Sequence, residues 1–302
     1  MKADRESDPG LQAVRASILE QDPDGIRIAR VLRNTLDQLY DGQRTGRYRW
    51  DQLHKTEKTH CGTLIEINLH REFGFNDGSV LDYEIAGVDV DCKYSQKLFA
   101  WMIPPEAHGH LCLLLWAHDE TDKWQMGLTR IDPGFLGAPN RDGKASLNAK
   151  GRSAITWIFV NHALPPNVLL HLDREVVDRI MGLKSGQQRV NELFRNALGM
   201  RVGRGVIATV AQQDDYMKRV RGNGGARTAL QPEGIVILGQ FKSHAEIAHK
   251  LGLQAPRNGE SIAVKLTSAE RGDLNAAQIE GQLYRIAHGR EPITAAPTLT
   301  KI

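Results

Sequence analysis

Hydrophobic residues recur at helical spacing early in the chain. Between residues 25 and 40 one face of a predicted helix is formed by Ile28, Val31, Leu32, Leu36 and Leu39. We predict Asp24 as the N-cap of this helix and Gly42 as its stop. A shorter amphipathic helix is predicted over residues 62–73.

The spacing then changes to that of strands. Residues 79–95 predict two strands that turn at Ala86-Gly87, and the apolar run at residues 110–118 predicts a fully buried central strand. Residues 155–163 add a further strand. Helices and strands that alternate in this way are typical of a layered α/β domain.

A proline pair within residues 164–167 marks a change of pattern, because paired prolines continue neither a helix nor a strand. Beyond it the chain is mostly helical with one strand at residues 234–241, and the order of helix, turn, helix and strand hairpin is that of a winged helix. We therefore predict an α/β domain over residues 1–163, a linker over 164–172, and a mainly helical, winged-helix domain over 173–302.

Length and charge agree with two domains of different chemistry. A chain of 302 residues can bury two cores without disulfides or metal staples. Residues 1–165 carry 20 Lys and Arg against 23 Asp and Glu, whereas residues 166–302 carry 19 against 13. The net charges of −3 and +6 favour metal chemistry in the first part and an anionic partner for the second.

Neither the apolar runs nor the cysteines indicate a membrane or secreted protein. The longest apolar run, residues 111–117, is far too short to span a bilayer, and the charged N-terminus has no signal-peptide core. Three cysteines without a C-x-x-C pair suit reduced thiols. We expect a cytoplasmic protein with no membrane partner.

One short segment joins the end of the first helix to a basic loop. Residues 39–42 have the form of the K-x-D-G element with which DNA ligases form a lysine–AMP adduct, but Leu39 replaces the lysine, so Asp41 and Gly42 stand without a nucleophile. Tyr48 and Trp50 are interleaved with basic residues that form either a solvated turn or a contact with a phosphate backbone. These residues are Arg44, Arg47 and Arg49.

A group of charged residues lies on the predicted hairpin. Because strand side chains alternate, Asp89, Asp91 and Lys93 share one face, whereas Cys92 points into the apolar layer. Asp82, on the preceding strand, can reach the same place. Two carboxylates about 4 Å apart repel by about 4 kcal/mol at an effective dielectric near 20. A bound Mg2+ would relieve this repulsion and polarise a scissile phosphate, while a lysine positions the attacking water.

Simpler interpretations fit the same residues. A D…D-x-K pattern is also typical of a surface hairpin whose charges face water. Glu66, on the helix before the hairpin, could supply a third carboxylate, but Thr63-x-x-Glu66 also fits a capping box. His108-x-His110-x-Cys112 has the period-two spacing of zinc ligands on one strand face but lacks a fourth partner.

Several long stretches occur together and in one order. They are "TLDQLYDGQRTG", "GTLIEINLHREF", "LDYEIAGVDVDCKYSQ" and "AQQDDYMKRVRGNGGAR". Together they resemble the NaeI-like type IIE restriction endonucleases, over roughly residues 20 to 290.

The resemblance implies a restriction-endonuclease-like mixed sheet flanked by helices, related to the mismatch-repair nuclease MutH and the PD-(D/E)xK group. It implies that Glu66, Asp82 and Asp91 bind Mg2+ and that Lys93 is the catalytic lysine. Leu81 precedes Asp82 where the wider group often has proline, which is a mild departure.

The resemblance also implies a second domain like the DNA-binding domain of the catabolite activator protein, a helix-turn-helix fold. It implies a homodimer that binds two copies of a palindrome in double-stranded DNA, one for cleavage and one as an allosteric effector. The best-known target of the family is GCCGGC, cut to leave 5′-phosphate and 3′-hydroxyl ends, and a cognate DNA methyltransferase is expected in the same system.

Two segments compete for the helix-turn-helix. One packs Val206, Ile207 and Val210 in a first helix and Tyr216, Met217 and Val220 in a second. The other has Ser243 as N-cap, Glu246 three residues on, and Ile247, Ala248 and Leu251 on one face. We prefer the first, because its exposed face is basic. The residues expected to contact DNA, besides the arginines after Gly42, are Lys97, Lys218, Arg219, Arg221 and Arg227.

The leading hypothesis is a Mg2+-dependent, site-specific endonuclease for double-stranded DNA. The alternative is a sequence-specific DNA-binding regulator whose nuclease-like domain is only a scaffold. A nucleotidyltransferase would need the lysine that is absent at position 39.

Overall fold

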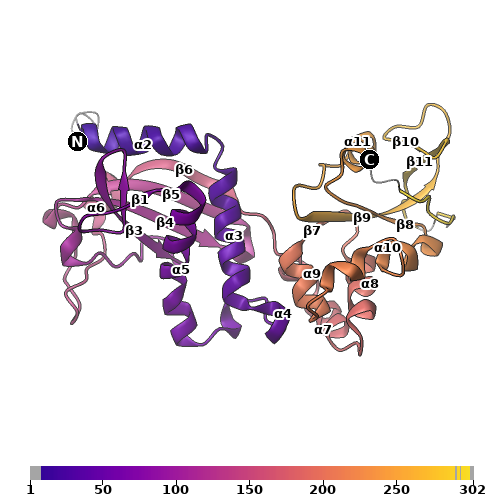
Figure 1. Cartoon of the computed structure of the whole chain (residues 1–302), viewed down its shortest axis with the longest axis horizontal. Helices are drawn as coiled ribbons and strands as arrows, with labels where there is room; N and C mark the ends of the chain where they lie inside the picture. Colours follow the sequence, from indigo (N-terminus) through magenta and orange to yellow (C-terminus); the bar gives the residue numbers. More distant parts are fainter. Residues whose placement is uncertain (1–7, 290, 293, 300–302) are drawn as a thin grey trace. The chain divides into compact units, whose positions relative to one another are not determined.

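The structure is a computed structural model that describes residues 8–289, 291–292 and 294–299. It divides into two compact units (Figure 1). The first contains the chain up to Leu39 together with Leu53–Pro165, and the second contains Tyr40–Gln52 together with the chain from Pro166 onward. The sequence prediction placed Tyr40–Gln52 in the first domain, so this segment is a difference between prediction and structure.

A six-stranded mixed sheet forms the centre of the first unit, in the order β1-β2-β3-β4-β5-β6. The pair β3 and β4 is parallel, and the other neighbouring pairs are antiparallel. The strands are β1 (Asn76–Asp77), β2 (Tyr83–Ile85), β3 (Val88–Ser95), β4 (Leu111–His118), β5 (Lys123–Arg130) and β6 (Thr156–Ala163). The first five residues of β4 are all buried, which confirms the prediction of a buried central strand.

Helices flank this sheet (Figure 1). They are α2 (Pro9–Gln21), α3 (Ile26–Tyr40), α5 (Lys55–Phe73) and α6 (Ala149–Ala154). Helix α5 packs against β3, and α2 packs against β5. The first unit is therefore the mixed α/β domain expected from the alternation of helices and strands.

The ends of α3 differ from the prediction by one or two residues. Its apolar stripe is buried, including Leu39 at 6 % exposure. Asp22, not Asp24, caps its first turn, because the Asp22 carboxylate accepts the N–H groups of Arg27 at 3.1 Å and Ile28 at 2.9 Å. At the other end Asp41 takes a left-handed φ of 47°, so the helix stops before Gly42.

Helix α5 begins well before the predicted residue 62. The carboxylate of Glu57 accepts the backbone N–H of His54 at 2.8 Å, which is the capping interaction of its first turn. Thr63 and Glu66 therefore lie inside the helix, and their interpretation as a capping box is wrong. The Glu66 side chain is not used by the helix terminus.

The second unit combines helices with a five-stranded sheet. Its helices are α4 (Gly42–Thr45), α7 (Arg174–Met181), α8 (Gly186–Asn196), α9 (Arg204–Ala211), α10 (Ala226–Ala229) and α11 (Lys242–Lys250). Its strands are β7 (Arg201–Gly203), β8 (Ile235–Leu238), β9 (Glu260–Ser268), β10 (Ala277–Ile279) and β11 (Gln282–Ile286). The order is β10-β11-β9-β7, with β8 also paired to β9. The sequence predicted only β8, so "mainly helical" understates the strand content.

The segment Tyr40–Gln52 is built into the core of the second unit. Tyr48 is 8 % exposed and packs in the same hydrophobic cluster as Val168 and Leu169, which the prediction had assigned to a linker. The Asn167 side-chain amide donates a hydrogen bond to the Tyr48 carbonyl at 2.9 Å. A Cβ on Gly42 would collide with Thr209 Oγ1 on α9, so the contact of α4 with α9 requires glycine.

Neither candidate helix-turn-helix segment has the predicted form in full. Helix α9 buries Val206, Ile207 and Val210 as expected, but the element after it, Tyr216–Val220, is a short 3-10 helix. In the other segment α11 begins at Lys242 with Phe241 as its N-cap, so Ser243 is not the cap.

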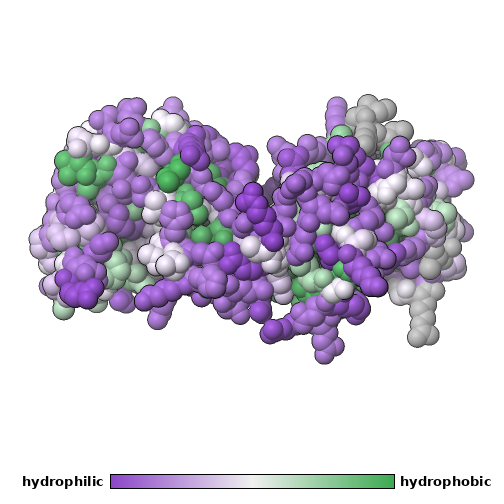
Figure 2. Space-filling view, turned by 60° about the horizontal axis from the view of Figure 1, so that its bottom comes forward, coloured by the Kyte–Doolittle hydropathy of each residue, from purple (hydrophilic) through white to green (hydrophobic). Residues whose placement is uncertain are grey.

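Polar residues cover most of the face seen in Figure 2. Large exposed hydrophobic side chains occur in both units: Ile26, Val80, Met102, Val160, Leu198 and Leu274. Within the described residues we find no helix with the length and apolar composition needed to cross a bilayer.

Candidate functional site

The hairpin of β2 and β3 brings the predicted acidic residues and the lysine together. Ala86 and Gly87 take left-handed φ values of 52° and 75°, which is typical of a two-residue hairpin turn and agrees with the prediction. The antiparallel register places Asp82, which immediately precedes β2, opposite Asp91 on β3. Two carboxylates therefore meet at one end of the hairpin.

Lys93 lies between these two carboxylates. Its Nζ is 2.5 Å from Asp91 Oδ1 and 3.4 Å from Asp82 Oδ2, and it also donates to the Cys92 carbonyl at 3.0 Å. Asp82 Oδ2 is fixed from the other side by the Cys92 backbone N–H at 2.7 Å. Asp91 is only 3 % exposed, which does not fit a surface hairpin whose charges all face water.

Burial and neighbouring charges shift the proton affinities of this group. Burial raises the pKa of Asp91 to about 6, although the charge of Lys93 opposes the rise. Burial alone would lower the pKa of Lys93, but the charges of Asp91 and Asp82 outweigh it, so the Lys93 pKa is raised. Lys93 is therefore an ammonium ion at neutral pH.

Glu66 approaches this group from α5, which packs against β3. The Tyr83 hydroxyl donates to the Glu66 carbonyl at 2.8 Å and ties β2 to the helix. Burial raises the pKa of Glu66, and the negative charge of Asp82 raises it further. Glu66, Asp82 and Asp91 thus act on one another electrostatically.

These residues fit Mg2+ as a two-carboxylate site. Mg2+ usually takes one or two carboxylates and completes its shell with waters and substrate phosphates. Asp82 and Asp91, which face each other across the hairpin, provide such a pair. Within the described chain no three His, Cys, Asp or Glu side chains are gathered as a metal-binding group, and a two-carboxylate site does not require one.

Other residues suggested by the sequence lie apart from this group or have another role in it. Asp89 accepts hydrogen bonds from the Ser79 N–H at 2.8 Å and the Ser79 hydroxyl at 2.6 Å. The zinc interpretation of His108, His110 and Cys112 is wrong, because these side chains form no metal-binding group among the described residues. Cys112 is instead fully buried and donates to Asp91 Oδ2 at 3.7 Å.

The contact of Cys112 with Asp91 was missed by the sequence analysis. It follows from the parallel pairing of β3 with β4, which sets Asp91 opposite Cys112. The sequence carries no local signal of it, since strand order is not encoded in the alternation of side chains. The same pairing places buried leucines, Leu113 and Leu114, opposite Cys92 and Lys93.

The arginines after Gly42 differ in their availability. Arg44 is 82 % exposed, with Asp41 3.7 Å away. Arg47 Nε donates to the Tyr40 carbonyl at 3.3 Å. Arg49 pairs with Asp51 at 3.3 Å and lies over the Tyr48 ring at 5.6 Å.

The other predicted DNA contacts fall into paired and unpaired groups. Lys97 is exposed in the turn after β3. Lys218 and Arg219 pair with Asp215 at 3.3 Å and 3.0 Å. The side chains of Arg221 and Arg227 have no ion pair or hydrogen bond among the described residues, and both line a hollow in the second unit.

Comparison with known proteins shows the family of the chain. The family model described as "Restriction endonuclease NaeI" matches residues 12–295. The chain is 53 % identical to the type II restriction enzyme NaeI of Lentzea aerocolonigenes, over 98 % of this chain and 96 % of that protein. The mixed α/β unit with its Asp-Asp-Lys group is consistent with the restriction-endonuclease-like fold of such enzymes. The chain therefore belongs to the NaeI family of type II restriction endonucleases, which are DNA-cleaving enzymes.

Proposed function

We propose that the chain is a Mg2+-dependent type IIE endonuclease that hydrolyses phosphodiesters of double-stranded DNA at a palindrome, with GCCGGC as the candidate site. The observation that supports the catalytic part is the buried Asp91 carboxylate, paired with Lys93 and facing Asp82. Buried charges persist when they are paired or ready to receive a cation, and this group has both features.

Each residue of this group has its own role in the proposed reaction. Asp82 and Asp91 hold Mg2+. Glu66 adds a third carboxylate, which interacts electrostatically with Asp82 and Asp91. Mg2+ held by these carboxylates would supply polarisation of the scissile phosphate and a more acidic water. Lys93, which is protonated because its pKa is raised, orients the attacking water and offsets the negative charge that develops on the phosphate. The products carry 5′-phosphate and 3′-hydroxyl ends.

We further propose a homodimer that binds two DNA copies, with the first unit cutting one and the second unit holding the other as an effector. The helix-turn-helix of a winged-helix domain is assigned to α9 and residues 216–220. Charge supports this division, because the second unit has 22 Lys and Arg against 15 Asp and Glu, whereas the first has 17 against 21. A cognate DNA methyltransferase would protect the same sites in the host.

A DNA-binding regulator with an inactive nuclease unit is the second candidate. Its only support is the basic second unit, and the intact group of Asp82, Asp91 and Lys93 speaks against it.

The test is cleavage of supercoiled DNA that carries one GCCGGC site, with Mg2+ or with a chelator. The Lys93→Ala variant is compared with Lys123→Ala, which removes an exposed lysine of the same unit outside the site. We expect linear product only with Mg2+, with wild-type protein and with Lys123→Ala. Tight binding of the wild-type protein without cleavage would favour the regulator.

The two-site proposal has its own test. A short duplex that contains GCCGGC is added in trans to the single-site plasmid, and a scrambled duplex is the control. We expect the specific duplex to accelerate cleavage. Equal rates with both duplexes would overturn the effector site but leave the nuclease assignment intact.

A further inference from the structure

A hollow of about 300 Å³ opens in the second unit, at a distance in sequence from the Asp-Asp-Lys group. Its walls come from the start of α9, the loop before α10, the loop after β8 and the start of β9. Three of its lining residues are arginines: Arg204, Arg221 and Arg227. The hollow is thus a concentration of positive charge on several segments of one unit.

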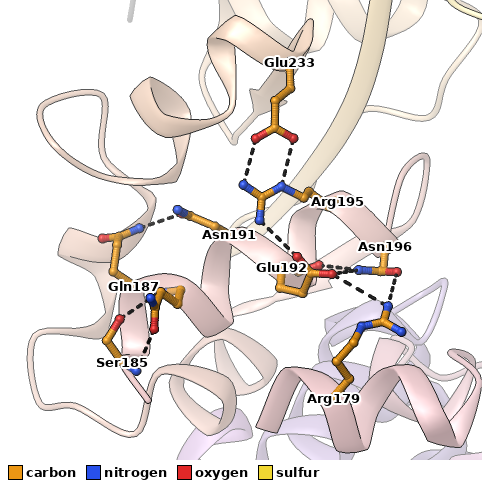
Figure 3. A network of polar contacts seen from close by, with 9 residues as sticks. Arg179, Ser185, Gln187, Asn191, Glu192, Arg195, Asn196 and Glu233 are labelled. Atoms are coloured by element: carbon orange, nitrogen blue, oxygen red, sulfur yellow. Dashed lines mark hydrogen bonds and ion pairs between the residues drawn. The ribbon is translucent and has the colours of Figure 1, made fainter. Parts of the chain in front are cut away.

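The guanidinium groups of these three arginines have no ion pair or hydrogen bond within the part of the chain that the structure describes. Other arginines of the same unit are fully engaged (Figure 3). Arg195 forms two bonds to the Glu233 carboxylate, at 2.8 Å and 2.7 Å, and a third to Glu192 at 3.0 Å. Arg179 contacts Asn196 at 3.2 Å and Glu192 at 3.7 Å. The unit therefore pairs some arginines with carboxylates, whereas the guanidinium groups that line the hollow have no such partner among the described residues.

A glycine makes room for one of the three side chains. A Cβ on Gly239 would lie 2.9 Å from Arg227 Nη2, so a larger residue would displace this guanidinium. Gly259 has a left-handed φ of 82°, which favours glycine, and a Cβ there would be in ordinary van der Waals contact with the Arg204 stem at 3.5 Å. The Gln240 side chain accepts the Gly259 N–H at 2.7 Å and holds the two glycine loops together. The absence of a side chain at Gly239 thus leaves space for the Arg227 guanidinium.

The charge of the hollow is about +2. Glu260 is its one acidic lining residue, and its carboxylate is already used by the Arg257 N–H at 3.0 Å and by Arg201 at 3.9 Å. Burial lowers the pKa of Arg227, but a guanidinium remains charged in proteins. The unpaired guanidinium of Arg227 is partly buried and is costly unless a ligand supplies the negative charge, whereas Arg204 and Arg221 are exposed.

We propose that this hollow binds a phosphate monoester dianion, the group carried by a 5′-phosphorylated DNA end or by a free nucleotide. A monoester carries close to two negative charges near neutral pH, which matches the excess of +2, whereas a backbone diester carries one. Arginine forks bind phosphate oxygens in pairs of hydrogen bonds. A concave site suits a terminal group that projects from its carrier. The DNA end as the source rests on the proposed function, because that cleavage produces 5′-phosphates.

The experiment measures binding by the full chain in chelator, where no cleavage occurs. Isothermal titration compares a dinucleotide with a 5′-phosphate, the same dinucleotide with a 5′-hydroxyl, a nucleoside 5′-monophosphate and inorganic phosphate. We expect the 5′-phosphate to bind at least about tenfold more tightly than the 5′-hydroxyl form, and inorganic phosphate to compete. Tighter binding of the dinucleotide than of the mononucleotide identifies a DNA end as the source, and equal binding identifies a nucleotide.

Variants assign the effect to the hollow. Arg204→Ala and Arg227→Ala should abolish the preference for the 5′-phosphate. Arg271→Ala, which removes an exposed arginine of the same unit outside the hollow, should keep it. Gly239→Ala leaves all charges in place and should weaken binding by crowding Arg227, so it tests the site even if an arginine variant unfolds.

Two results would overturn the proposal. Equal affinity for the phosphorylated and unphosphorylated dinucleotides would mean that only a diester is recognised. A preference that survives in Arg204→Ala, Arg227→Ala and Gly239→Ala would place the site elsewhere. If the wild-type protein binds the 5′-phosphate but does not cleave GCCGGC, the proposed nuclease is refuted. The proposal that the hollow binds a phosphate monoester would remain.

Discussion

The two units handle charge in opposite ways. In the first, Asp91 is 3 % exposed and its counter-charge, Lys93, is supplied by the same strand at 2.5 Å. In the second, three arginines line a hollow without any described partner. Groups that are held in place before the substrate arrives stabilise the transition state of a reaction. In a binding site the ligand itself can supply the opposite charge. The comparison predicts that substitutions in the first unit affect rate and those in the second affect binding.

The largest effect is expected from Lys93→Ala. The variant loses the ammonium that offsets charge at the phosphate, so single-turnover cleavage should fall by on the order of 10³-fold or more. Binding of specific DNA, measured by fluorescence anisotropy in chelator, should change by less than about threefold, since removing one phosphate contact has a modest effect. A large loss of affinity with little loss of rate would break the division between the units.

The pH dependence of the metal requirement is the next effect in size. Asp91 has a pKa of about 6 because of its burial, and the pKa of Glu66 is also raised. As the pH falls through about 6, Asp91 takes up a proton that competes with the cation, and the raised pKa of Glu66 acts in the same direction. The half-saturating Mg2+ concentration should therefore rise by up to about tenfold per pH unit for each proton displaced, and it should level off above neutral pH.

Single-turnover cleavage over a Mg2+ series at several pH values measures this shift. Asp89→Asn is the matched control, because Asp89 lies on the same strand but bonds to Ser79. A half-saturating concentration that is the same at acidic and neutral pH would contradict the assignment of the metal to these carboxylates.

A pair of glycine substitutions tests the packing of each unit. Gly42→Ala should lower the free energy of unfolding by about 1–3 kcal/mol, because the new Cβ collides with Thr209 and lies 2.7 Å from the Arg47 carbonyl. Gly62→Ala, inside α5 with no atom near its Cβ, should raise it by about 0.5–1 kcal/mol. Thermal unfolding measures both, and hydrogen exchange should place the loss in the second unit. Destabilisation of the first unit alone by Gly42→Ala would refute the assignment of this segment.

The smallest effect is expected from Cys112→Ala. A thiol at 3.7 Å from Asp91 Oδ2 is a weak donor, so its loss should slow cleavage only a few-fold, or about 0.5–1 kcal/mol. Cys61→Ala is the control, since Cys61 is buried on α5 away from Asp91. A similar change of rate in both variants, in step with their stability, would mean that Cys112 acts only through packing.

The local parts of the site could be predicted from the sequence. Alternation with period two placed Asp91 and Lys93 on one face, and the Ala86-Gly87 turn brought Asp82 back toward them. These relations span few residues, so strand geometry and turn chemistry decide them. For Glu66 the sequence allowed two interpretations, a third carboxylate of the site and a member of a capping box. The structure rules out the capping box, because the helix begins at Lys55.

The non-local parts could not be predicted. The contact of Cys112 with Asp91 depends on which strand lies beside β3, and the alternation of side chains does not contain that information. Charge counting placed Lys218 and Arg227 in one basic group, yet Asp215 pairs with the first and nothing described pairs with the second. Ion pairing depends on the distances between charged groups in the folded chain, and a count of charges contains no distances.

The segment Tyr40–Gln52 has a consequence for the ancestry of the chain. An end-to-end joining of two genes produces a polypeptide that passes from one unit to the other once. Here the chain passes between units at Leu39–Tyr40, at Gln52–Leu53 and at Pro165–Pro166. The first half of the gene therefore encodes the whole first unit, but the second half does not encode the whole second unit, because a fragment that starts at Pro166 lacks the Tyr48 side chain of its own core. A second unit transferred to another protein would need the segment Tyr40–Gln52 to complete its core.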